Sequence, residues 1–124
     1  MLTDRSGALK GKNVLIVEDE AFVAMALESA FSDAGAKVLG PAATLDEAME
    51  LTSSGKIDAA ILDIDLAGLD VYPAADILVE RNVPFVFQTG HGQRSELKIK
   101  YPDVRVCKKP VSRKDLIAAL AELF

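Results

Sequence analysis

The chain has 124 residues, the length of one ordinary domain, and half of them are hydrophobic, so it can bury a substantial core. Its formal net charge of −5 argues against a nucleic-acid backbone or an anionic membrane surface as a direct partner. A single cysteine, no apolar run near the ~20 residues of a membrane span and no secretion signal at the N-terminus favour a cytoplasmic protein.

The predicted elements alternate between strand and helix. In chain order we expect a short polar tail at 1–12, then a strand at 13–19, a helix at 20–35, a strand at 37–42, a helix at 44–55, a strand at 58–64, a helix at 71–82, a strand at 84–90, a weak helix at 93–101, a strand at 104–109 and a last helix at 112–124. The first strand is predicted by a continuous apolar run from Val14 to Val17.

Local signals place the helix ends. The first helix has apolar residues at helical spacing, and Gly35 is a plausible stop. Thr44 followed three residues later by Glu47 is the capping-box pattern of a helix start. The aromatic and sulfur-bearing residues of the first helix, Phe22, Met25 and Phe31, are expected in the core.

Continuous apolar strands alternating with helices predict an α/β fold, with a parallel sheet covered on both faces. In such a sheet, ligands gather outside the carboxyl ends of the strands. The polar residues that follow or end the expected strands are Glu18, Asp19, Asp63, Thr89 and Lys109. Because four strands end in this way, these side chains are expected to form one site.

This set of side chains suits phosphoryl chemistry. Clustered carboxylates repel unless a cation joins them, and oxygen ligands with room for water favour Mg²⁺. A carboxylate can then act as a nucleophile and become an aspartyl phosphate. A lysine adds a point charge for the phosphoryl group, and a hydroxyl adds a hydrogen bond. The residues therefore predict a magnesium-dependent phosphoryl-acceptor site.

The same residues resemble the receiver domain of the response regulators of two-component systems. The matching segments are "VLIVEDE", "AAILDIDLAG", "PFVFQTGHG" and "CKKP", and the resemblance covers residues 13–124. It implies a flavodoxin-like, doubly wound sheet of five parallel strands in the order 2-1-3-4-5, with about five helices. It also implies a phosphoprotein that takes part in phosphorelay signal transduction and is not an enzyme acting on other molecules.

The resemblance assigns metal ligands. It makes Asp63 the phosphoacceptor and a ligand of Mg²⁺, and it makes Asp19 the main side-chain ligand. Glu18 helps through water, and the backbone carbonyl of Asp65 is the third protein ligand.

The resemblance also assigns the residues that respond to phosphorylation. Thr89 becomes the switch hydroxyl, and Lys109 pairs with the phosphoryl group. The bond between Lys109 and Pro110 is expected to be cis, as in the family. Asp65 and His91 hold positions that tune the lifetime of the phosphoryl group in the family, although a lone histidine is more often an ordinary surface residue.

A narrower resemblance concerns "PFVFQTGHG", which is similar to the FATGUY subgroup of bacterial single-domain regulators, with Gln88 in place of the usual alanine. Ordinary receivers carry an aromatic residue three positions before the lysine, and this chain has Val106 there. We therefore hypothesise that signalling depends on reordering of residues 93–100 instead of on the usual coupling between threonine and aromatic ring.

The implied phosphodonor is a histidine kinase that binds mainly through the first helix. No output domain is expected after Phe124, so output is expected through an unknown downstream protein, as a phosphate sink or by relay. We expect a monomer or a weak dimer, with an apolar face near 104–107 and the last helix as the candidate surface for self-association.

Two other interpretations remain. One is a pseudo-receiver, a binding module without a phosphoryl switch, which is favoured by Val106 and disfavoured by the intact acids and lysine. The other is a phosphatase, because "ILDID" also resembles the Asp-x-Asp strand end of the haloacid-dehalogenase type. Against it, that motif belongs on the first strand of its fold, and no late acidic pair follows Lys109.

Overall fold

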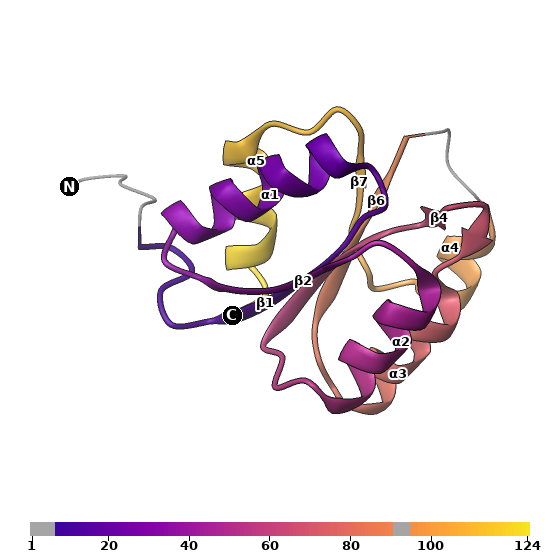
Figure 1. The fold of residues 1–124 in the computed structure, drawn as a ribbon. Helices are drawn as coiled ribbons and strands as arrows, with labels where there is room; N and C mark the ends of the chain where they lie inside the picture. Colours follow the sequence, from indigo (N-terminus) through magenta and orange to yellow (C-terminus); the bar gives the residue numbers. More distant parts are fainter. Residues whose placement is uncertain (1–6, 91–94) are drawn as a thin grey trace.

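A computed structural model describes residues 7–90 and 95–124 of the chain. The strands of the main sheet are β1 (Asn13–Val17), β2 (Lys37–Ala42), β3 (Ala59–Asp63), β6 (Phe85–Thr89) and β7 (Val106–Lys108). The helices are α1 (Ala21–Asp33), α2 (Leu45–Ser54), α3 (Tyr72–Glu80), α4 (Ser95–Lys100) and α5 (Arg113–Ala121). Two short strands, β4 (Asp65–Leu66) and β5 (Leu69–Asp70), form a separate antiparallel pair (Figure 1).

The main sheet has the order β2-β1-β3-β6-β7, and all of its pairs are parallel. This confirms the expected doubly wound architecture, because β6 and β7 are the fourth and fifth strands of that sheet. The register pairs Val17 with Leu62 and Asp63 with Gln88. The carboxyl ends of β1, β3 and β6 therefore lie at one edge of the sheet.

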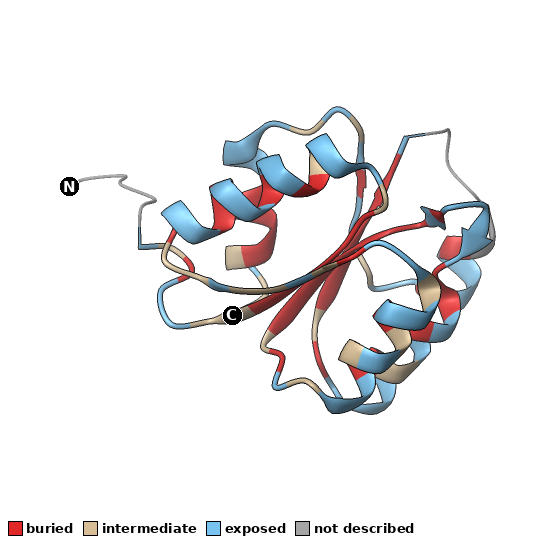
Figure 2. Cartoon of the chain, viewed as in Figure 1, coloured by how far each residue is buried: buried red, intermediate tan, exposed pale blue. Residues whose placement is uncertain are grey.

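The strands send alternate side chains to two cores, as their period of two requires. Along β1, Leu15 and Val17 belong to one core, whereas Val14 and Ile16 belong to the other. Helices α2, α3 and α4 cover the first face, and α1 and α5 cover the second (Figure 1). The inner strands β1, β3 and β6 are buried, whereas β2 and β7 at the edges of the sheet and the outer sides of the helices are partly exposed (Figure 2). This burial explains why continuous apolar runs predicted the inner strands.

The segment from residue 7 to Lys12 was expected to be part of a polar tail. It packs on the core that lies under α1 and α5. Leu9 has no exposed surface and lies in the cluster that contains Phe31 and Leu120. The backbone N–H of Leu9 donates to the carbonyl of Ala34, at 2.9 Å. Leu9, the partly buried Ala8 and backbone bonds to Ala34 and Gly35 fix a segment that has no hydrophobic periodicity of its own.

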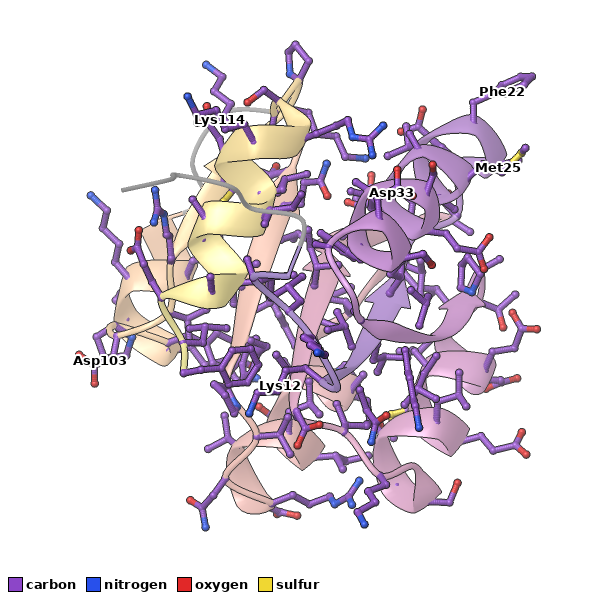
Figure 3. All side chains as sticks on the ribbon, turned by 90° about the vertical axis from the view of Figure 1, so that its left-hand side faces the viewer. Lys12, Phe22, Met25, Asp33, Asp103 and Lys114 are labelled. Atoms are coloured by element: carbon purple, nitrogen blue, oxygen red, sulfur yellow. The ribbon has the colours of Figure 1, made fainter. Side chains whose placement is uncertain are left out.

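Helix α1 buries a narrower face than its sequence suggested. Phe31 is fully buried as expected, but Phe22 is 87% exposed and Met25 is 62% exposed, so the expectation for these two is wrong (Figure 3). They lie three residues apart on a different side of the helix from Leu27 and Phe31. The helix ends as expected before Gly35, whose φ of +95° suits glycine.

The start of α2 has the expected capping box. The N–H of Glu47 donates to Oγ1 of Thr44 at 3.1 Å, and Oε1 of Glu47 accepts the N–H of Thr44 at 3.2 Å. We expect Thr44→Ala to lower the free energy of unfolding by about 1 kcal/mol, because N–H groups of the first turn lose an acceptor. Urea unfolding measures this effect. Ser53→Ala, at an exposed position of α2, should change stability by less than about 0.5 kcal/mol.

The β4–β5 pair is absent from the expected elements, and it matters because it follows β3 directly. Ala67 and Gly68 join the two strands, both with positive φ, at 53° and 86°. Helix α4 occupies part of the weak helix expected at 93–101, and His91 and Gln93 lie outside the described residues. Within the described ranges, no helix has the length and apolar character needed to cross a bilayer.

Candidate functional site

Three of the expected side chains meet at the carboxyl edge of the sheet. Glu18 follows β1, Asp63 ends β3 and Lys109 follows β7. The Nζ atom of Lys109 lies 2.8 Å from Oε1 of Glu18 and 3.2 Å from Oδ2 of Asp63. Both acidic residues are buried: the exposed fraction is 1% for Glu18 and 5% for Asp63. The ammonium group therefore compensates two carboxylates that are shielded from water.

A third carboxylate in this cluster, that of Glu20, was missed by the sequence analysis. Its Oε1 lies 3.2 Å from Nζ of Lys109. Glu20 precedes α1 with extended backbone angles, φ −81° and ψ 113°. Extended residues two apart point to the same side, so Glu20 joins Glu18. The alternation in "EDE" was the signal that could have identified it.

Asp19 lies in the same area, but its carboxylate has a different contact. Its Oδ2 accepts a hydrogen bond of 3.1 Å from the N–H of Ala67, in the turn between β4 and β5. It also lines a pocket of about 250 Å³ together with Asp63, Asp65 and Gly90. Asp19 therefore faces the site from the side of the hairpin.

The remaining expected residues surround Asp63. The backbone N–H of Asp65 donates to Oδ1 of Asp63 at 3.3 Å. Thr89 is buried at the end of β6, and its carbonyl accepts the N–H of Lys109 at 2.7 Å. The Lys109–Pro110 bond is cis, as the sequence resemblance implied.

Electrostatics in the cluster are set by burial and by close charges. Burial, assisted by the nearby Asp63, raises the pKa of Glu18 to about 7 despite the opposing effect of Lys109. Burial alone would lower the pKa of Lys109, but Glu18 and Asp63 outweigh it and hold that pKa above its ordinary value. Lys109 is therefore a fixed cation, whereas Glu18 changes charge near neutral pH.

This difference predicts how stability depends on pH in metal-free buffer. The pKa of Glu18 is about 7 in the folded protein and 4.5 without the fold, so the folded state holds a proton that the unfolded state has lost. The contribution is complete below about pH 4.5 and is lost as the pH rises through about 7. Glu18→Gln should remove this part of the slope, as measured by urea unfolding at several pH values. Equal slopes in both proteins would contradict the assignment.

The acidic cluster suits a divalent metal ion. Glu18, Glu20 and Asp63 each offer a carboxylate oxygen, and these atoms lie within 4.8 Å of one another. Hard oxygen donors next to an open pocket are the environment that Mg²⁺ prefers, because this ion keeps several of its waters. The donor set present in this chain therefore fits Mg²⁺.

On the face of the sheet that α2, α3 and α4 cover, aromatic rings pack around Tyr101, the residue that follows α4. Tyr101 packs against Phe85 and Phe87, with ring centroids 6.2 and 5.2 Å apart. Its hydroxyl donates to Oδ1 of Asp76 in α3, at 2.6 Å. Val106, the position without the expected aromatic residue, is 37% exposed. The aromatic packing next to β6 therefore comes from Tyr101, which follows α4, and from Tyr72 of α3, and not from position 106 of β7.

Comparisons with known sequences agree with this geometry. A family model for the response regulator receiver domain matches residues 14–121. The transcriptional regulatory protein PdtaR of Mycobacterium tuberculosis is 34% identical over 95% of this chain and 58% of its own length. The positive alginate biosynthesis regulatory protein of Pseudomonas aeruginosa is 37% identical over 87% of this chain and 45% of its own length. The chain thus spans about half the length of these curated relatives.

Solved structures give the same result. A response regulator receiver protein from Sinorhizobium medicae has a TM-score of 0.80 and 29% identity, and the match covers 93% of this chain and 95% of the other. The receiver domain of PhyR from Erythrobacter litoralis has a TM-score of 0.77 and 30% identity, covering 94% and 92%. The similarity therefore extends over nearly the whole chain and the whole fold.

Proposed function

Because the chain belongs to the response regulator receiver domain family, a family of signalling domains, we propose that it accepts a phosphoryl group from a histidine kinase on Asp63. The observation that carries the proposal is the position of the Asp63 carboxylate. It is buried at the end of β3, held by Lys109 at 3.2 Å, and it lines an open acidic pocket. A phosphoryl donor can therefore approach a single, oriented nucleophile.

The proposed step is a direct transfer. A carboxylate oxygen of Asp63 forms a bond to phosphorus while the bond from phosphorus to the histidine nitrogen of the donor breaks. The electron pair of the broken bond stays on the imidazole, which leaves as the neutral group after it takes up a proton. Lys109 lies close enough to Asp63 to pair with the added negative charge, and Thr89 ends the neighbouring strand. The product is an aspartyl phosphate on this chain.

Magnesium fits the proposal. Asp19, Asp63 and the backbone carbonyl of Asp65 are the proposed ligands, with Glu18 acting through water, and Glu20 is close enough to contribute. When bound, Mg²⁺ would neutralise the carboxylates and polarise a phosphoryl oxygen. The Lys109 ammonium group now contacts the carboxylates of Glu18, Glu20 and Asp63. We therefore expect Lys109 to move away from some of these oxygens when Mg²⁺ binds.

The proposed partners are a histidine kinase and a downstream protein in the bacterial cytoplasm. PdtaR and the alginate regulator are named as regulators of transcription or biosynthesis, which are properties of those longer proteins. Output of this chain through protein binding, as a phosphate sink or by relay is part of the proposal, as is a monomeric or weakly dimeric state.

The test is intact mass spectrometry after incubation with acetyl phosphate and Mg²⁺. The natural protein should gain one phosphoryl group, and EDTA should prevent this gain. Asp63→Asn should gain none, because an amide cannot act as the nucleophile, whereas Asp103→Asn, at an exposed remote position, should behave like the natural protein. If no adduct forms from acetyl phosphate or from a phosphorylated kinase, the chain is a pseudo-receiver and the proposal is wrong.

We propose that α4 carries the response, in line with the exposed Val106. Helix α4 is a short helix of six residues, anchored by the buried Leu97 and by the buried Tyr101 that follows it. We expect beryllium fluoride, a phosphoryl analogue, to change amide hydrogen exchange in 95–101 at least several-fold, while β3 changes little. Equal exchange of 95–101 with and without the analogue would exclude this route.

A further inference from the structure

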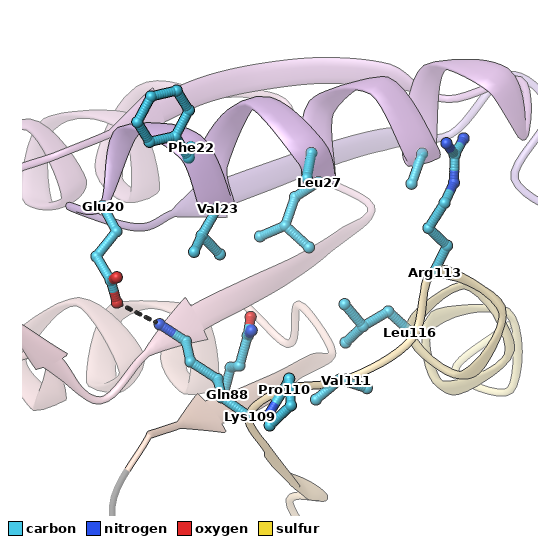
Figure 4. Close-up of a pocket in the computed structure, with 12 residues that line it drawn as sticks. Glu20, Phe22, Val23, Leu27, Gln88, Lys109, Pro110, Val111, Arg113 and Leu116 are labelled. Carbon is cyan, nitrogen blue, oxygen red and sulfur yellow. Dashed lines mark hydrogen bonds and ion pairs between the residues drawn. The ribbon is translucent and has the colours of Figure 1, made fainter.

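A groove of about 360 Å³ lies between α1 and the segment that leads into α5 (Figure 4). Its walls are largely apolar, formed by Val23 and Leu27 of α1 on one side and by Pro110, Val111 and Leu116 on the other. This volume is in the range of sites for small molecules, which are typically apolar with a few placed polar groups. The groove is distinct from the acidic pocket, although Glu20 and Lys109 line both.

One polar side chain, that of Gln88, lies in this apolar groove. Gln88 alternates with Phe87 along β6, so it points to the same face as Val86, toward α1 and α5. It is only 3% exposed, and its carboxamide forms no hydrogen bond with any residue in the described part of the chain. In Figure 4 the amide points from the sheet toward Val23 and Leu27. Among the described residues, the amide nitrogen and oxygen of Gln88 are not fully enclosed, so they reach the open groove, where a ligand can replace water with its own hydrogen bonds.

The charges at the rim of the groove are already compensated. Glu20 pairs with Lys109 at 3.2 Å, and Arg113 pairs with Asp33 at 2.8 Å. An ionic ligand would have to compete with these pairs, whereas an uncharged ligand would leave them intact. The complement of this groove is therefore an uncharged molecule with an apolar body.

We infer that the groove binds a small, uncharged, apolar molecule that carries a hydrogen-bond donor next to an acceptor, as a primary carboxamide or a lactam does. The Gln88 carboxamide offers the matching acceptor and donor, so two parallel hydrogen bonds can form. The apolar body lies against Val23, Leu27 and Val111. This site goes beyond the phosphoacceptor function and does not depend on it.

The test compares two probes of nearly equal shape, benzamide and acetophenone, by ¹H–¹⁵N NMR titration. Acetophenone has a methyl group where benzamide has its amide nitrogen, so it retains the acceptor and loses the donor. Benzamide should shift the side-chain NH₂ signal of Gln88 and the amide of Val111 in a saturable way. It should bind about tenfold more tightly than acetophenone.

Two variants separate this site from non-specific binding. Gln88→Met keeps the length of the side chain and an apolar surface, so it should fold, as checked by circular dichroism, and should bring the affinity ratio close to one. Ala26→Trp, at an exposed position on the rim, should fill the groove and weaken both probes at least several-fold. An unchanged ratio in Gln88→Met would overturn the proposal. Chemical shift changes of Gln88 that do not saturate with benzamide would also overturn it. The groove would then be a candidate site for a side chain of a protein partner.

Discussion

Replacing Lys109 with methionine is expected to lower the free energy of unfolding by about 3–5 kcal/mol near pH 8 in metal-free buffer, because it leaves buried carboxylates without their cation. The ammonium group lies within 3.2 Å of Glu18, Glu20 and Asp63, and the first and last of these are buried. Methionine keeps the aliphatic length of lysine, so the loss reports charge more than packing. Urea unfolding measures the change.

Two further variants test the electrostatic cause of this loss. Lys108→Met removes a neighbouring exposed lysine from β7 and should change stability by less than about 0.5 kcal/mol. Adding Glu18→Gln to Lys109→Met should restore part of the lost stability, because one of the unpaired charges is gone. Mg²⁺ should also raise the unfolding midpoint of Lys109→Met, since it supplies positive charge to the same oxygens. Equal stability of the two lysine variants would show that the carboxylates do not depend on Lys109.

The sheet and most of the site could be predicted because they depend on short-range patterns. Strands buried on both faces must be continuously apolar, so Val14–Val17 and Ala59–Leu62 were recognisable. A parallel sheet places the ends of its strands at one edge, so Asp63 and Lys109 could be expected to meet although 46 residues separate them. The family resemblance then gave each of them a role that sequence periodicity alone could not give.

The β4–β5 hairpin could not be predicted because its local signals are weak. Each strand has two residues, too few to show alternation, and the turn uses Ala67 and Gly68 where Asn-Gly is the usual sequence for two positive φ angles. The consequence reaches the site, since the N–H of Ala67 holds the Asp19 carboxylate. The contact of Asp19 with this hairpin was therefore beyond sequence reasoning, whereas the place of Glu20 beside Glu18 follows from the alternation in "EDE".

The burial of Leu9 also could not be predicted from the sequence, and replacing this residue is expected to cause the second large loss of stability. Leu9→Ala should lower the free energy of unfolding by about 2–5 kcal/mol, because a fully buried leucine leaves a cavity between α1 and α5. Sequence alone could not indicate this, because one apolar residue in a polar segment has no periodicity. The packing partners, Phe31 and Leu120, are 22 and 111 residues away along the chain.

A matched control separates the side chain of Leu9 from the segment that carries it. Lys10→Ala changes an exposed neighbour and should shift stability by less than about 0.5 kcal/mol. The Cα of Lys10 lies 2.9 Å from where a Cβ on Gly35 would be, so Gly35→Ala should also destabilise the protein by crowding the same segment. If Leu9→Ala and Lys10→Ala have the same unfolding midpoint in urea, residues 7–12 do not contribute to the core and the domain begins at β1. A loss confined to Leu9→Ala and Gly35→Ala would place the start of the cooperative unit before β1, because both changes act on the contact between this segment and the end of α1.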